Sequence, residues 1–262
     1  MLKAYTIGLS VINSTKTVIS INNKLIIQIM PPRLHFLENK QYQKHLFMKR
    51  LIIAITPLIL FSCQNAPKAD KAEATEAQSV SQTLSAEYKA DIQKSVIEWV
   101  GTKPVGRHHG TLKLSDGSLS APEGKLIGGK FTIDMNTLTP DDQDAEGNAK
   151  LQGHLKSEDF FNVSKYPSST FEITEVKQGV TGSDVIMKDA THTITGNLTM
   201  KGITKSITFP AKIASNGNQV TADAEFNIDR TQWDITYGND KSLGDKFIRP
   251  EVNIKLHLIT NK

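Results

Sequence analysis

Apolar and polar residues alternate along most of the chain from about residue 95 onward. In the clearest run, residues 220–229, every even position is apolar and every odd position is polar. A period of two residues is typical of a β-strand that buries one face, because successive side chains point to opposite sides of a sheet. The same pattern recurs in residues 96–100, 111–114, 126–135, 170–176, 194–200, 203–213 and 252–258, with Lys205 as an exception. The alternation predicts about seven or eight antiparallel strands.

Glycine and Asn/Asp clusters separate these runs, and Asn216-Gly217 is a strong hairpin signal. Residues 141–162 show no alternation, so we expect a loop there followed by one or two short helices. Strands with one apolar face must close on themselves or stack as a sandwich, because open edges promote aggregation. Closure of about eight strands leaves an interior that side chains fill or that holds one small ligand. The residues alone leave both options open.

Charge and cysteine content exclude several classes of function. The formal net charge of the 262 residues is +4, but residues 89–262 carry 21 Lys/Arg against 22 Asp/Glu, so the excess lies in residues 1–88. A nearly neutral body lacks the basic surface that nucleic acid requires, and we expect no nucleic-acid partner. With one cysteine, the chain has no intrachain disulfide and no thiolate-rich zinc or iron–sulfur site. No cofactor is expected.

The segment around that cysteine reads as a secretion signal. Lys49 and Arg50 precede an apolar run over residues 51–61, and Ser62 and Cys63 follow. The run is too short to span a bilayer permanently. Its end, residues 60–63, resembles a bacterial lipobox, which predicts lipidation at Cys63 and a membrane as partner. The alternative is an ordinary signal in which Cys63 is only a small residue.

These features divide the chain into four parts. We expect residues 1–47 to be a start-site artefact or an extension without a readable function, with translation beginning at Met48. Residues 48–62 are predicted to be a lipoprotein signal peptide. Residues 63–88, poor in branched and aromatic side chains, read as a flexible tether. Residues 89–262 carry the folded domain.

Motifs for catalysis or metal binding are weak. Residues 142–147 imitate the first half of an EF-hand loop, but the twelfth position is Gly153 instead of a bidentate glutamate, so a solvated acidic loop is the better interpretation. His108 and His109 are neighbours on an expected strand and point to opposite faces, and we expect no metal site. The sequence has no Gly-x-Ser-x-Gly elbow, and its cysteine lies in the leader. We therefore expect no enzyme activity.

Three sequence blocks carry a resemblance to a known family. They are GHLKSEDFFN at residues 153–162, followed by KYP at 165–167 and TF at 170–171; ITGNLTMKGITK at 194–205; and FNIDRTQWDI at 226–235. In this order they resemble the YceI-like family over about residues 89–262. One departure is Gly153, where the family commonly has an acidic residue, so no role of that acid transfers here.

The resemblance implies an all-β fold, an eight-stranded antiparallel lipocalin-like β-barrel with one or two short helices inserted. It also implies a location in the bacterial cell envelope and a long apolar ligand, such as a polyisoprenoid or a fatty-acid derivative, inside the barrel. The implied function is non-enzymatic carriage or sequestration of this lipid. The rival hypothesis is a structural or interaction barrel with a filled core. The sequence does not fix the oligomeric state, and a dimer is one option.

The candidate ligand-binding residues combine the inward-facing positions with the family-like blocks. His154 is the candidate for orienting a ligand head group, and the alternative for it is packing of the helix. The large aromatic residues among the candidates can equally serve as core. The full set is Phe131, Ile133, His154, Leu155, Phe160, Phe161, Phe171, Ile173, Leu198, Ile207, Phe209, Phe226, Ile228, Trp233, Ile254 and Leu256.

Overall fold

The computed structural model describes residues 19–21, 24–26, 65–80, 88–180 and 184–262. The predicted signal peptide and Cys63 lie outside the described residues, as does most of the extension before them. Within residues 1–60, which form a unit of their own, β1 (Ile19–Ile21) pairs antiparallel with β2 (Lys24–Ile26). None of the helices formed by the described residues has the length and apolar character needed to cross a bilayer.

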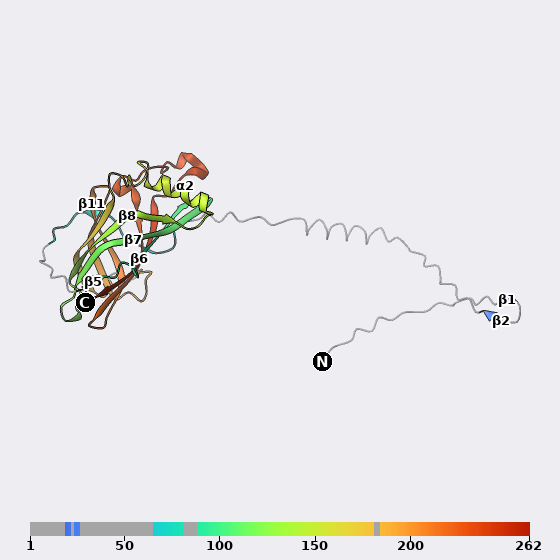
Figure 1. Ribbon diagram of the computed structural model, residues 1–262, viewed down its shortest axis with the longest axis horizontal. Helices are drawn as coiled ribbons and strands as arrows, with labels where there is room; N and C mark the ends of the chain where they lie inside the picture. Colours follow the sequence, from blue (N-terminus) through green and yellow to red (C-terminus); the bar gives the residue numbers. More distant parts are fainter. Residues whose placement is uncertain (1–18, 22–23, 27–64, 81–87, 181–183) are drawn as a thin grey trace. The chain divides into compact units, whose positions relative to one another are not determined.

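Eight long antiparallel strands form a closed barrel (Figure 1), which confirms the expected fold. Each strand pairs with the next along the chain, and the last pairs with the first to close the ring. The strands are β6 (Val96–Lys103), β7 (Gly106–Ser120), β8 (Gly128–Pro140), β9 (Ser168–Gln178), β10 (His192–Met200), β11 (Ile203–Ser215), β12 (Gln219–Asp229) and β13 (Glu251–Asn261).

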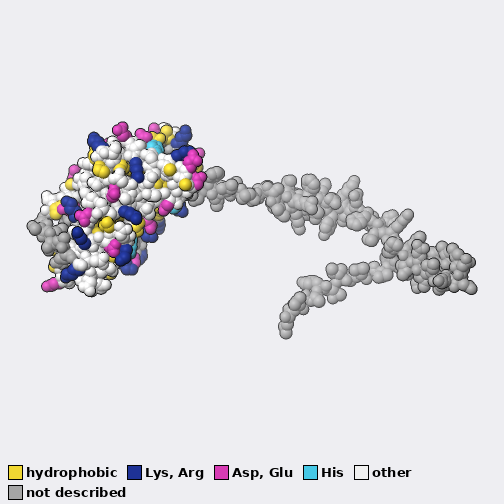
Figure 2. All heavy atoms as spheres, in the orientation of Figure 1, with side chains coloured by type: hydrophobic (Ala, Val, Ile, Leu, Met, Phe, Trp, Pro, Cys, Tyr) yellow, Lys and Arg dark blue, Asp and Glu magenta, His cyan; other side chains and the backbone are white. Residues whose placement is uncertain are grey.

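The alternation in the sequence becomes the two faces of the barrel wall. In β12 the even positions Val220, Ala222, Ala224, Phe226 and Ile228 are buried and belong to one hydrophobic core. The outer surface is polar, and in Figure 2 acidic and basic side chains are interspersed over the visible face of the barrel. Burial of one face of every long strand supplies the main driving force for folding.

Short helices gather at one end of the barrel, which we call the mouth. The helix α2 (Ala145–Lys156) connects β8 to β9 and confirms the expected helical insertion. Its N-cap, Asp144, accepts a hydrogen bond from the Gly147 backbone N–H at 2.7 Å. The 3₁₀ helices η2 (Arg230–Trp233) and η3 (Lys241–Lys246) lie between β12 and β13. In Figure 1, α2 and the orange-red η3 lie at the same end, while β5 and the C-terminus lie at the opposite end.

Elements outside the eight-stranded ring complete the fold. The short helix η1 (Pro122–Gly124) connects β7 to β8, and β5 (Tyr88–Ala90) pairs with β7 and β13. Upstream, β3 (Asp70–Lys71) and β4 (Thr75–Glu76) belong to a segment, residues 65–80, that we call the strap.

The strap fills a gap between two strands of the wall. β11 and β12 pair with each other only through Lys212–Ser215 and Val220–Asp223. Where this pairing ends, β3 pairs in parallel with β12, and β4 pairs antiparallel with β11. Ala72, between the two short strands, is buried in the core cluster. The strap is therefore part of the barrel wall.

This arrangement corrects the expected flexible tether over residues 63–88 as far as residues 65–80 are concerned. Side-chain amides of the barrel hold the strap by its backbone: Asn227 donates to the Pro67 carbonyl at 3.0 Å, and Asn197 bonds both the backbone N–H and the carbonyl of Gln78, at 2.9 and 2.7 Å. The strap needs few apolar side chains because backbone groups make its contacts, so a prediction from composition misses it. Residues 81–87 lie outside the described residues.

Candidate functional site: an apolar cavity at the mouth of the barrel

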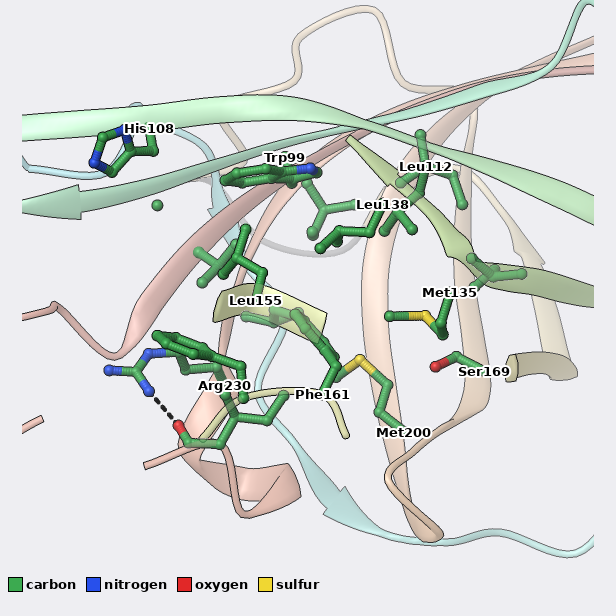
Figure 3. Close-up of a pocket in the computed structure, with 18 of the residues that line it drawn as sticks. Trp99, His108, Leu112, Met135, Leu138, Leu155, Phe161, Ser169, Met200 and Arg230 are labelled. Carbon is green, nitrogen blue, oxygen red and sulfur yellow. Dashed lines mark hydrogen bonds between the residues drawn. The ribbon is translucent and has the colours of Figure 1, made fainter. Parts of the chain in front are cut away.

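A cavity of about 490 Å³ occupies the half of the barrel nearest the mouth (Figure 3). Its wall consists mainly of inward-facing apolar side chains from all eight long strands, and Leu151 and Leu155 of α2 also line it. Cavities of this size and apolar character are typical of sites for small apolar molecules. Water gains few hydrogen bonds from such a wall.

Four phenylalanines, Phe131, Phe171, Phe209 and Phe226, lie at the deep end of the cavity, and we call them the floor. The rings of Phe209 and Phe226 stack with centroids 4.1 Å apart, and those of Phe171 and Phe209 lie 5.7 Å apart. The next inward positions along β9, β11 and β12 are buried but do not line the cavity; they are Ile173, Ala211 and Ala224. The barrel is therefore packed below the floor and hollow above it.

Two glycines make room for the floor. A Cβ atom at Gly117 would lie 2.3 Å from Cδ1 of Phe131, and one at Gly196 would lie 2.4 Å from Cζ of Phe171. Both distances are far below van der Waals contact. Each glycine thus lets a phenylalanine ring lie across the neighbouring strand, as glycines within strands do where another group approaches closely.

The mouth is bordered by α2 and by an aromatic cluster. The ring of Tyr237 packs edge-on against His154, with centroids 4.8 Å apart, and lies 5.2 Å from Phe160. His154 also hydrogen-bonds Asp159 through Nε2 at 3.0 Å. All three aromatic side chains line the cavity. His154 therefore both packs the helix end and borders the cavity, so the structure accommodates both interpretations of this residue.

Arg230 holds the loop that forms the other side of the mouth. Its guanidinium donates hydrogen bonds to the backbone carbonyls of Ile235, Tyr237, Ile248 and Arg249. Burial lowers the pKa of Arg230 from its ordinary value. Because its guanidinium donates to these carbonyls, Arg230 shapes the loop of residues 235–249. Contacts to a ligand would then come from other groups.

Polar side chains at the mouth complete the wall. His108 hydrogen-bonds Asp142 through Nδ1 at 2.8 Å, and Lys103, Asp245 and Lys246 also line the cavity. Within the described residues, no group of three or more His, Cys, Asp or Glu side chains is arranged to hold a metal ion. The site thus pairs an apolar interior with a charged rim.

All but two of the candidate ligand-binding residues lie on the cavity wall, and their role in binding stays a prediction. Ile173 lies below the floor. Trp233 is fully buried, and its indole N–H donates to the Leu198 carbonyl at 3.0 Å, so it supports the wall from behind. The candidate lipidation site, Cys63, lies outside the described residues.

Sequence reasoning missed several wall residues. Trp99, Leu112, Met135 and Leu138 line the cavity, and the alternation along β6, β7 and β8 contained the signal for them. Tyr237 lies in an irregular loop and Lys246 ends the short helix η3, and neither segment is long enough for a period in the sequence to indicate which way a side chain points.

Comparisons with known proteins agree with this architecture. The YceI-like domain description matches residues 88–259. A UPF0312 protein of Pseudomonas paraeruginosa is 37% identical over 141 residues, which are 52% of this chain and 66% of the relative. A UPF0312 protein of Yersinia enterocolitica is 34% identical over 139 residues, covering 52% of this chain and 65% of the relative. The matches thus span somewhat less than two thirds of these relatives.

Among solved structures, the crystal structure of Burkholderia cenocepacia BcnA is similar, with a TM-score of 0.51 and 23% identity, over 65% of this chain and 98% of BcnA. At this identity the likeness concerns the fold alone. The closed barrel, its helical insertion and the domain match over residues 88–259 together show that this chain belongs to the YceI-like domain family.

Proposed function

We propose that this protein is an envelope lipoprotein that binds an amphipathic lipid, of the polyisoprenoid or fatty-acid class, for carriage or sequestration without catalysis. The observation that carries the proposal is the apolar cavity of about 490 Å³ above the phenylalanine floor. A filled barrel, the rival interpretation, would leave no such space.

The chemistry of the wall supports a ligand with one long apolar chain. Transfer of apolar surface from water into this cavity contributes about 25 cal/mol per Å², so a long chain gains a large hydrophobic term with few polar contacts. The charged and polar groups lie at the mouth, where Lys103, His154, Asp245 and Lys246 line the cavity. A lipid would therefore bind with its chain toward the floor and its polar end at the rim.

The envelope location rests on the sequence of the leader. The basic and apolar segment of residues 49–61 and the lipobox-like residues 60–63 support export and lipidation at Cys63. Attachment to a membrane would keep the barrel close to the pool of its ligand.

Native mass spectrometry of Cys63→Ser protein, produced in the original host, tests lipid binding. We expect an apolar molecule to co-purify, and the stripped protein to take up an added polyprenol. A clean mass for the protein alone, together with no uptake, would leave the filled or empty structural barrel as the better interpretation.

A cavity-filling variant makes the test specific to the site. Gly101 lines the cavity, and a Cβ atom there meets nothing within 4 Å, so Gly101→Trp can place an indole in the space proposed for lipid. Gly153 on α2 is exposed with equally open surroundings, and Gly153→Trp is the matched control. We expect loss of polyprenol uptake only in Gly101→Trp, with both variants folded. Equal uptake by the two would place the lipid elsewhere.

A further inference from the structure

The three most exposed large hydrophobic side chains among the described residues all belong to segments around the mouth. Val105 is 53% exposed, Tyr237 46% and Leu243 45%. Val105 lies in the tight turn between β6 and β7, and Leu243 lies in η3. Single exposed apolar side chains are common on soluble proteins, whereas several of them at one end indicate a surface that meets another apolar phase.

Hydrogen bonds join these segments into one surface. The Arg249 backbone N–H donates to the Thr102 carbonyl at 2.9 Å, which ties the end of β6 to the loop after η3. The Ile248 N–H donates to the Gly238 carbonyl at 2.7 Å, and Arg230 holds Tyr237 and Ile248 from below. The turn of Val105 and the helix of Leu243 are therefore attached to one framework, and Lys103 and Lys246 of these segments line the cavity.

Basic side chains surround these apolar tips. The turn contributes Lys103 and Arg107, and the loop of residues 237–249 contributes Lys241, Lys246 and Arg249; the same two segments carry Asp240 and Asp245 as their acidic residues. The acidic start of α2, with Asp141, Asp142, Asp144 and Glu146, lies beside the turn, where Asp142 hydrogen-bonds His108 at 2.8 Å and Asp141 hydrogen-bonds His109 at 2.6 Å. The two segments that carry the apolar tips thus contain five basic residues against two acidic ones.

We propose that this surface, formed by Val105, Tyr237 and Leu243 with Lys103, Arg107, Lys241 and Lys246, docks on an anionic lipid bilayer. Apolar tips that insert at the headgroup boundary, together with lysines and arginines beside them, are the features of peripheral membrane binding. Docking there places the opening of the apolar cavity against the bilayer, so a lipid chain passes between the two without crossing water. This inference rests on the proposed lipid binding.

Co-sedimentation with vesicles tests the docking surface in Cys63→Ser protein, which has no lipid anchor of its own. We expect binding to vesicles of phosphatidylcholine mixed with phosphatidylglycerol, weaker binding to pure phosphatidylcholine, and weakening by salt. Leu243→Asp and Val105→Asp should each reduce the affinity about tenfold, because each replaces an inserted side chain with a charge. The charge reversals Lys241→Glu and Arg107→Glu should remove the preference for phosphatidylglycerol.

Val180→Asp is the matched control. Val180 is 40% exposed and follows β9 at the opposite end of the barrel, so the docking surface predicts unchanged vesicle binding. An equal loss in Val180→Asp, or no binding of the parent protein to anionic vesicles, would overturn the proposal. So would a change of oligomeric state in Leu243→Asp without loss of vesicle binding, which would assign the surface to a second copy of the chain.

Uptake of polyprenol from cyclodextrin separates this inference from the proposed function. Val105 and Leu243 do not line the cavity, so their variants should take up polyprenol from cyclodextrin as the parent does while failing to acquire it from vesicles. If uptake from cyclodextrin occurs but vesicles are not bound, docking is wrong and lipid binding stands. If neither occurs, the proposed function itself is wrong.

Discussion

Single glycines decide how deep the cavity reaches. Gly196 lies beneath Phe171, and a methyl group there would also approach the Glu172 carbonyl oxygen at 2.8 Å. We predict that Gly196→Ala destabilises the fold by about 1–3 kcal/mol, because both the Phe171 ring and the backbone at Glu172 must shift to admit the methyl group. Gly101→Ala is the control, since its Cβ meets no atom within 4 Å. Chemical denaturation measures both, and equal stabilities would show that Phe171 relocates freely.

The floor should also set the preferred chain length. Phe226 stacks on Phe209 and borders the cavity, so Phe226→Ala extends the space toward the packed half of the barrel. We predict a shift toward longer polyprenols, read by native mass spectrometry with a graded series. The stability loss should stay below the ~3–5 kcal/mol of a fully packed phenylalanine, because one side of the ring already faces empty space. If Phe226→Ala and Phe209→Ala each lower the free energy of unfolding by the full ~3–5 kcal/mol and lipid binding is unchanged, these residues belong to the packed core and do not form a binding site.

The alternation in the sequence identifies which residues face inward, but it does not determine where the cavity ends. Phe171 and Ile173 have the same parity on β9, yet the first lines the cavity and the second lies below it. The difference arises because aromatic rings from other strands meet across the barrel at this level. These contacts join residues far apart in the sequence, so no local pattern indicates them. The wall was therefore largely predictable, while the floor needed the assembled structure.

Among the elements, the strap shows the limit of local patterns. β3 and β4 have two residues each, too few for a period, and their partners lie more than a hundred residues away. The long strands, by contrast, each carry four or more alternating positions in the sequence. The helix α2 was indicated because this alternation is missing from residues 141–162.

Asn227 holds the strap from the barrel side. Its side chain donates to Pro67 and accepts from Asn253 at 2.9 Å, and both asparagines are buried. We predict that Asn227→Ala costs about 1–3 kcal/mol, because it also leaves the Asn253 amide unpaired. Hydrogen exchange should then speed up in residues 65–80 more than in β6 or β7. Asn216→Ala, in the exposed β11–β12 turn, is the control. Unchanged exchange in residues 65–80 would show that the short strand pairings suffice.

At the scale of the whole molecule, we expect the barrel to fold without the predicted anchor. The barrel and the strap include no residue before 65 among the described ones. We predict that Cys63→Ser yields a folded, ligand-competent barrel that lacks lipid. Metabolic labelling with a fatty acid, followed by purification, checks this outcome. Label retained by Cys63→Ser would refute lipidation at this cysteine.

The strap also shortens the flexible linker between the predicted lipid anchor and the barrel. A freely flexible stretch over residues 63–88 would have an r.m.s. reach of roughly 25–30 Å, and the barrel could tumble at its end. Because Asn227 binds the Pro67 carbonyl, only four residue steps separate that point from Cys63, at most about 14 Å of extended chain. A protein lipidated at Cys63 would consequently be held close to the bilayer, and its range of orientations relative to the membrane would be restricted. Its encounters with lipid would then be governed by two-dimensional diffusion and by the tilt of the barrel axis relative to the membrane.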